Sequence, residues 1–181
     1  MAWQDQLRSN ALHWLLEVDM PGVRYLALRD LLDYPPDDPE LQAAQVAAHT
    51  QGPIDTVLAH MEKAGYWVEP GPGYNPKYRS TVWSIILLAQ LGASAEQDER
   101  IARACAYVLD HALTAGGQFT ASGAPSGTAD CLQGNLCAAL VGGLPMISGA
   151  TPVAVSTKAT SAPAPATGPT SLGKVASVLV H

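Results

Sequence analysis

Residues 126–143 read SGTADCLQGNLCAALVGG, a polar stretch that turns apolar after residue 135. Its polar part contains Asp130, Cys131, Gln133, Asn135 and Cys137. Such a run is either a metal or catalytic site or the first turn of a buried helix. An Asp ahead of an apolar run is a typical helix N-cap, and a free Cys often packs as a small hydrophobe. We therefore predict a buried helix that Asp130 caps, with Cys137 in the core.

The metal alternative is weak because of helix geometry. Cys131 and Cys137 are six positions apart, which separates them by about 240° around a helix. Tetrahedral zinc needs four convergent ligands. We expect no metal site here and no cofactor.

A repeat appears when the chain is compared with itself at an offset of 52 residues. Each copy reads as a helix, a Gly-aromatic pair, a loop and a buried helix. The matched pairs are Met61 with Leu113, Gly65 with Gly117, Trp67 with Phe119, and Leu88 with Leu140. Internal repeats of helix pairs indicate a stacked or closed helical array.

Apolar residues elsewhere recur at helical spacing between Pro/Gly turns, which predicts an all-α fold. Asp19 is expected to cap a helix that Pro35 ends, and Ser94 with Gln97 to form a capping box. An Asp37-Asp38 pair in a Pro-bounded loop is expected to cap the next helix. The further predicted helices cover residues 3–18, 40–49, 54–63, 81–92 and 94–113.

Composition limits the function classes. The net charge of −6 argues against nucleic-acid binding, and the apolar runs are too short for a membrane span. The N-terminus has no signal-peptide pattern. Three scattered cysteines do not form a disulfide framework. We expect a cytoplasmic protein.

The last 39 residues, 143–181, contain no acidic and no aromatic residue and are rich in Ala, Pro, Thr, Ser and Gly. We predict a folded domain over residues 1–142 and a disordered tail after it. A frameshift or truncated reading would explain the change of composition, and a native disordered tail is the alternative. Loss of further helix pairs would leave an exposed apolar face and favour self-association.

Several segments resemble the α/α toroid superfamily, which includes squalene/hopene-type terpene cyclases and the β subunits of protein prenyltransferases. The resemblance rests on Gly116, Gly117 and Phe119, on Asp130 followed by LCAAL at 136–140, and on HWLLEVDMPGVRYLALRDLL at 13–32. It covers about residues 10–142 and implies a ring of helix pairs around an apolar cavity. Three readable pairs imply a partial ring.

The residues of this superfamily that carry catalysis are not matched. The prenyltransferase zinc ligands are an Asp, a Cys shortly after it and a distant His, whereas Asp130 and Cys131 are adjacent and the downstream His is His181. The cyclase Asp-x-Asp-Asp motif does not occur. Whether the chain is an enzyme stays open.

The candidate site is the loop YWVEPGPGYNPKYRSTVW, residues 66–83, because functional residues concentrate on loops. Electron-rich rings suit an apolar or cationic ligand, and the resemblance implies an isoprenoid-like small molecule. Packing between repeats is the alternative, for which we predict that the two tryptophans are buried. The candidate residues are Tyr66, Trp67, Tyr74, Tyr78 and Trp83, with Asp130 as a weaker addition.

Three function classes follow. The first is a toroid-type protein of unknown specific activity that binds an apolar ligand or is catalytically inactive. The second is a HEAT-like interaction module, to which MPGVRYLALRDLL at 20–32 also conforms. The third is a truncated product without function.

Overall fold

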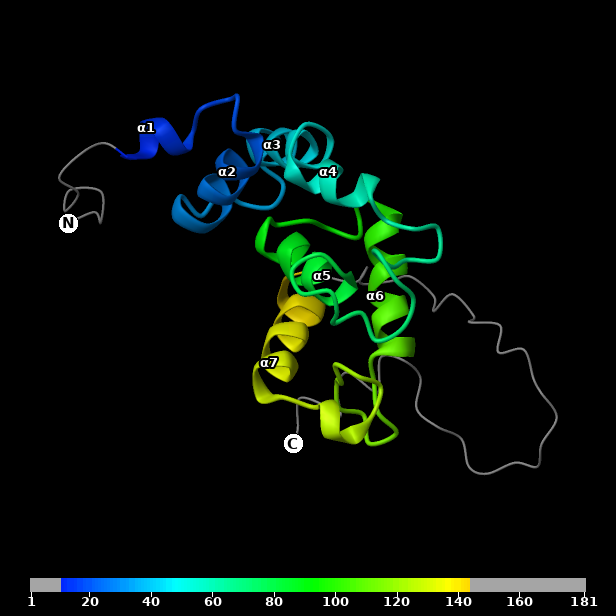
Figure 1. Cartoon of the computed structure of the whole chain (residues 1–181). Helices are drawn as coiled ribbons and strands as arrows, with labels where there is room; N and C mark the ends of the chain where they lie inside the picture. Colours follow the sequence, from blue (N-terminus) through cyan, green and yellow to red (C-terminus); the bar gives the residue numbers. More distant parts are fainter. Residues whose placement is uncertain (1–10, 144–181) are drawn as a thin grey trace.

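The computed structural model describes residues 11–143, and those residues form helices joined by turns and loops (Figure 1). They contain no strand beyond one isolated bridge between Leu113 and Phe119, so the all-α prediction is confirmed for this part of the chain. The helices are α1 (Ala11–Leu15), α2 (Pro21–Leu26), α3 (Pro39–Thr50), α4 (Pro53–Ala59), α5 (Thr81–Gln90), α6 (Glu99–His111) and α7 (Asp130–Ala138). A π-helical turn continues α2 (Ala27–Leu31) and another continues α7 (Ala139–Gly143).

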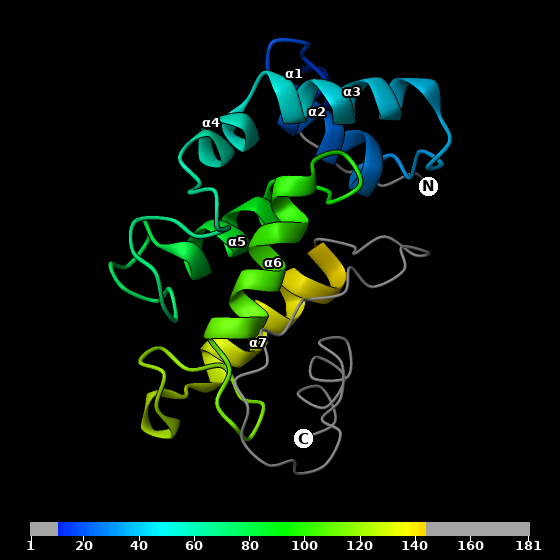
Figure 2. The same ribbon diagram turned by 90° about the vertical axis from the view of Figure 1, so that its right-hand side faces the viewer.

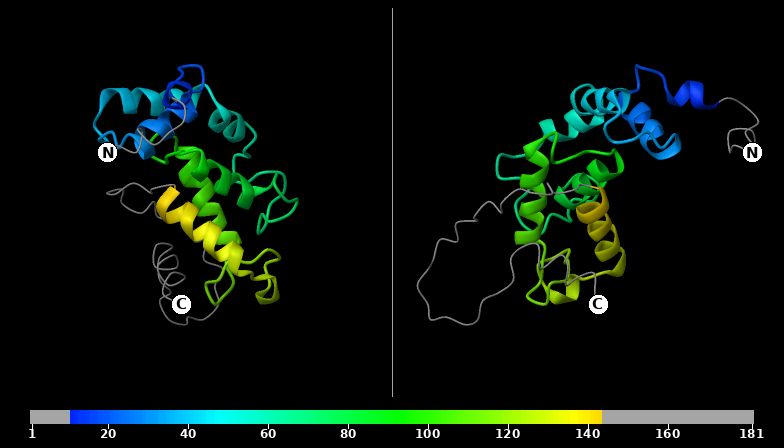
Figure 3. Two further views of the ribbon diagram at one scale, coloured as in Figure 1. Left: turned by 90° about the vertical axis from the view of Figure 1, so that its left-hand side faces the viewer. Right: turned by 180° about the vertical axis from the view of Figure 1, so that it is seen from behind.

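The helices form two groups. Helices α2 and α3 pack side by side with α4 next to them, whereas α5 lies against α6 and α7 (Figures 1 and 2). The loop between α6 and α7 lies at the end of the molecule far from α2 and α3 (Figure 3). Apolar side chains from both groups form one core, which includes Leu28, Ile54, Ile85, Ile101 and Leu136. Helix α1 contributes no buried residue.

Two helix starts show which capping predictions are correct. The Asp38 carboxylate accepts from the N–H of Glu40 at 2.8 Å and of Leu41 at 3.2 Å, so the capping role of that loop is confirmed. The Ser94–Gln97 capping box is wrong. Helix α6 begins later, with Asp98 as its N-cap.

Two further capping predictions are also wrong. The N-cap of α2 is Met20 rather than Asp19, and Pro21 starts the helix without a side-chain cap. Asp130 is the first residue of α7 and caps nothing, because Ala129 is the N-cap. A carboxylate in the first turn still interacts favourably with the helix dipole.

Several predicted boundaries differ from the structure. Helix α4 ends at Ala59 instead of residue 63. Of the helix predicted over residues 3–18, only α1 falls within the described residues as helix, and residues 3–10 lie outside them. The tail predicted after residue 142 lies outside the described residues from 144 onward.

The 52-residue repeat is present in the backbone. Gly65 and Gly117 both have left-handed φ values, 98° and 82°. Each donates its N–H to a carbonyl three residues earlier, that of Glu62 or Thr114, at 2.9 Å in both copies. The N–H of that earlier residue donates to the carbonyl of the residue after the glycine, at 2.8 and 2.9 Å. Both copies therefore make the same tight turn.

The aromatic residue after each turn is also held in the same way. The Trp67 N–H donates to Thr81 Oγ1 at 3.1 Å, and the Phe119 N–H donates to Gln133 Oε1 at 2.8 Å. Thr81 and Gln133 are themselves 52 residues apart. Both aromatic side chains are buried. In each copy of the repeat, a turn is followed by a core aromatic residue whose N–H is bonded to the start of the following helix.

Candidate functional site

The loop between residues 66 and 80 has a defined conformation. Val68 and Tyr78 have φ values of 68° and 65°, in the left-handed region that non-glycine residues rarely adopt. The Gly73 carbonyl accepts from the Val82 N–H at 2.9 Å and from Ser80 Oγ at 2.7 Å. These bonds hold the loop against the start of α5. Such left-handed residues cost about 1–3 kcal/mol each and concentrate at functional sites.

Three of the predicted aromatic residues lie together, and we call Tyr74, Tyr78 and Trp83 the aromatic cluster. The Trp83 ring centroid lies 5.3 Å from that of Tyr74 and 4.9 Å from that of Tyr78, with tilts of 53° and 52°. Trp83 Nε1 donates to the Tyr74 carbonyl at 2.8 Å, which fixes the indole. Lys77 Nζ lies 5.8 Å from the Tyr74 centroid. Tyr78 is 77% exposed, so the cluster is at the surface.

The other two predicted aromatic residues point elsewhere. Trp67 is buried in the core, as predicted, and its Nε1 donates to the Val57 carbonyl of α4 at 2.8 Å. Tyr66 lies 5.3 Å from Tyr107 of α6, whose hydroxyl accepts from the Gly71 N–H at 2.8 Å. These contacts attach the loop to two helices. Trp83, predicted to be largely buried, is only partly buried.

The cysteines and Asp130 do not meet. Asp130 and Cys131 are exposed in the first turn of α7, whereas Cys105 and Cys137 are buried. Burial raises the pKa of Cys105 to about 12 and also raises that of Cys137. Both buried thiols are therefore protonated at neutral pH and serve as core side chains. Within residues 11–143, no three His, Cys, Asp or Glu side chains are placed to hold a metal ion.

A second feature, the link between α5 and α6, was not expected from sequence. We call residues 92–98 the docking segment because it packs on α2 and α3. A Cβ on Gly92 would lie 2.8 Å from Tyr25 Cε1 of α2. The Ser94 N–H donates to His49 Nε2 at the end of α3, at 3.1 Å, and Gln97 donates to Gln45 at 3.4 Å. No local pattern predicts this contact, apart from a Gly-Ala-Ser run at its start.

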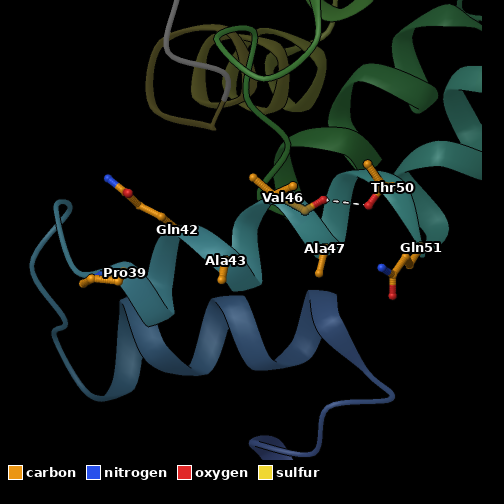
Figure 4. Close-up of a pocket in the computed structure, with 7 residues that line it drawn as sticks. All are labelled: Pro39, Gln42, Ala43, Val46, Ala47, Thr50 and Gln51. Atoms are coloured by element: carbon orange, nitrogen blue, oxygen red, sulfur yellow. Dashed lines mark hydrogen bonds between the residues drawn. The ribbon is translucent and has the colours of Figure 1, made fainter.

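Two shallow hollows lie on α3, away from the aromatic cluster. Figure 4 shows the first, in which the side chains of Gln42, Val46 and Thr50 point to one side of the helix and those of Ala43 and Ala47 to the other. Its lining contains no charged residue: Pro39, Gln42, Ala43, Val46, Ala47, Thr50 and Gln51. The second lies between α2 and α3, and Val18 and Arg24 are among its lining residues. Neither hollow includes a predicted site residue.

Comparison with known proteins adds no relative. No family model matches the chain, and no match was found among curated proteins or solved structures. Among the described residues, no helix is both long and apolar enough to cross a membrane.

Proposed function

We propose that the chain is a helical-repeat protein of the α/α toroid type that binds an apolar, isoprenoid-like small molecule at the aromatic cluster. The observation that carries the proposal is the contact of three aromatic rings at the surface of one loop and one helix. Tyr78 is largely exposed, Tyr74 and Trp83 are partly exposed, and Trp83 contacts both tyrosine rings. Rings held by such contacts offer an apolar area at a low cost in side-chain entropy on binding.

The neighbouring surface of α5 extends this apolar area. Leu87 is one helical turn after Trp83, on the same side of the helix, and is 42% exposed. The indole N–H of Trp83 is already bonded to the Tyr74 carbonyl. Its ring can therefore contact an apolar ligand without leaving a donor unsatisfied.

Binding rather than catalysis is proposed because the acidic and zinc-ligand motifs of the toroid enzymes are not matched in the sequence. Lys77 and Arg79 are exposed beside the cluster. Their cationic groups would contact a polar or anionic end of the ligand, while the rings contact its apolar part.

A titration with farnesol, a short isoprenoid alcohol, tests the proposal. Side-chain NMR signals of Trp83 and Tyr78 should shift, and Tyr78→Ala should weaken binding about fivefold or more, as loss of an aromatic contact of about 1 kcal/mol does. The matched control is Val46→Ala, which trims an exposed apolar residue on α3 and should leave the affinity unchanged. Equal affinities for wild type and Tyr78→Ala would contradict the proposal.

A HEAT-like interaction module is the second candidate. It is favoured by the uncharged hollow on α3 and by Trp14 of α1, which is 61% exposed. Exposed apolar surface of this kind is typical of protein-binding sites. If farnesol leaves the cluster signals unmoved, while Val46→Arg abolishes concentration-dependent association in sedimentation, the module is the better description.

A further inference from the structure

The docking segment joins two parts of the fold that are distant in sequence. It lies between α5 and α6, yet it packs on α2 and α3 through Gly92, Ser94 and Gln97. Ser94 is buried together with the alanines on both sides of it. The contact therefore holds α2 and α3 against the part of the chain that contains α5 and α6.

His49 supplies the acceptor of this contact, and its protonation state follows from the geometry. Nε2 accepts from the Ser94 N–H, so Nε2 carries no proton. The proton of the neutral ring must then reside on Nδ1. Nδ1 is buried and has no hydrogen-bond partner among residues 11–143, and the residue is only 7% exposed. In this geometry neither N–H of a doubly protonated ring would face an acceptor among the described residues.

We propose that His49 is a pH-sensitive switch that holds the docking segment on α3 when neutral and releases it when protonated. A proton on Nε2 removes the only acceptor shown for the Ser94 N–H and places two donors face to face. It also creates a buried charge. Separation of the docking segment from α3 relieves both, because water then solvates the imidazolium and the amide.

The charged groups around His49 do not offset the cost of protonation. Asp98, the N-cap of α6, is the acidic group that favours the cation, but Arg100 already binds its carboxylate at 2.7 Å. Arg100 also lies 3.8 Å from Asp55 of α4. Burial therefore outweighs Asp98 and lowers the pKa of His49 below 6.5.

Among the described residues, Asp98 is the only charged group that acts on the pKa of His49. The sequence of α5 contains no charged residue. On α2, the Tyr25 hydroxyl accepts from Gln45. The Arg24–Glu40 ion pair joins α2 to the first turn of α3, whereas His49 is in its last turn.

The direction of the pH effect follows from linkage. Once released, His49 has its ordinary pKa of 6.5, whereas in the docked state the pKa is lower. The released state therefore binds a proton that the docked state does not as the pH falls below 6.5. Docking is full above that pH and weakens below it. The opening constant of the contact rises by up to about tenfold between pH 7.5 and pH 5.5.

Nitrogen-resolved NMR of the imidazole and hydrogen exchange of the Ser94 amide test the proposal on the full chain. The His49 ring should be the Nδ1–H tautomer and titrate below 6.5. Protection of the Ser94 amide, corrected for intrinsic exchange, should fall by up to about tenfold from pH 7.5 to pH 5.5. In His49→Gln the side-chain oxygen still accepts but does not titrate, so the pH dependence should disappear.

His13→Gln is the matched control, because His13 is exposed on α1 and its loss should leave the Ser94 profile unchanged. An Nε2–H tautomer, a His49 pKa at or above 6.5, or the same pH dependence in wild type and His49→Gln would each overturn the proposal. The tautomer and the pKa are measured on the wild type, so they decide the matter even if His49→Gln does not fold.

Discussion

The two copies of the 52-residue repeat share their turn but differ in nearly every other aromatic position. Trp67 and Phe119 occupy equivalent places and are both buried. The three cluster residues have no aromatic counterpart, because the equivalent positions of Tyr74, Tyr78 and Trp83 are Ser126, Asp130 and Asn135. What the copies share therefore serves packing, and what only the first copy has is the candidate site.

The copies also differ in what covers their second helices. Helix α5 packs against α6 and α7, and Val82 in its first turn is fully buried. The equivalent position in α7 is Gly134, which is exposed, and no described residue lies within 4 Å of where a Cβ would be. Among residues 11–143, this face of α7 is therefore open, whereas α5 buries the equivalent face.

The largest expected effect tests whether the shared aromatic residues are equivalent. Trp67→Ala and Phe119→Ala should each lower the free energy of unfolding by about 3–5 kcal/mol, because each leaves a large cavity in the core. Urea denaturation measures both. Tyr78→Ala is the control and should change stability by about 0.5 kcal/mol or less, because the ring is largely exposed. A small loss at Phe119 alone would break the equivalence of the copies.

Removal of the side-chain acceptor for the backbone N–H of Trp67 or Phe119 should have the next largest effect on stability. Gln133 accepts from the Phe119 N–H and donates to the Phe119 carbonyl at 2.7 Å, so Gln133→Met leaves two backbone groups unpaired. We expect a loss of about 2–3 kcal/mol. Thr81→Val removes only the acceptor of the Trp67 N–H and should cost about 1–2 kcal/mol. Hydrogen exchange of the Trp67 and Phe119 amides locates each effect, and equal losses would contradict the difference in bonding.

The smallest effect has the opposite sign and tests the open face of α7. Gly134→Ala should raise the free energy of unfolding by about 0.5–1 kcal/mol, because Ala favours the helix and meets no neighbour. Gly65→Ala is the contrasting control. Gly65 has a left-handed φ, and a Cβ there would lie 2.8 Å from the Arg103 carbonyl oxygen. A loss of stability in Gly134→Ala would show that this face of α7 is covered.

Local signals predicted the helices because each signal acts within one turn. Asp38 before Pro39 satisfies free N–H groups whatever the rest of the chain does. The surface ion pair between Glu99 and Arg103 lies at 3.0 Å, because residues four apart are neighbours on a helix. The Ser94–Gln97 box failed because a long-range contact overrides the local signal. Ser94 lies in the docking segment, where its backbone N–H donates to His49, and the helix begins only after Asp98.

The candidate site was predicted only as a group of aromatic residues. In a loop without periodic structure, the spacing of residues along the chain does not determine which way each side chain points. Left-handed backbone at Val68 and Tyr78 separates the buried Trp67 from the exposed Tyr78. The π-helical turns after α2 and α7 were not predicted, because they continue the same apolar pattern as an α-helix.

The sequence by itself determined the helical class of the described residues, the 52-residue repeat and the buried role of Trp67, whereas Trp83, also predicted to be buried, is only partly buried. Helical periodicity, glycine in a tight turn and the burial of large aromatic residues are local requirements. Only the tertiary structure decided that Tyr74, Tyr78 and Trp83 meet, and that Ser94 meets His49 across 45 residues. Long-range contacts depend on which helix faces pack together, and no local pattern specifies that choice.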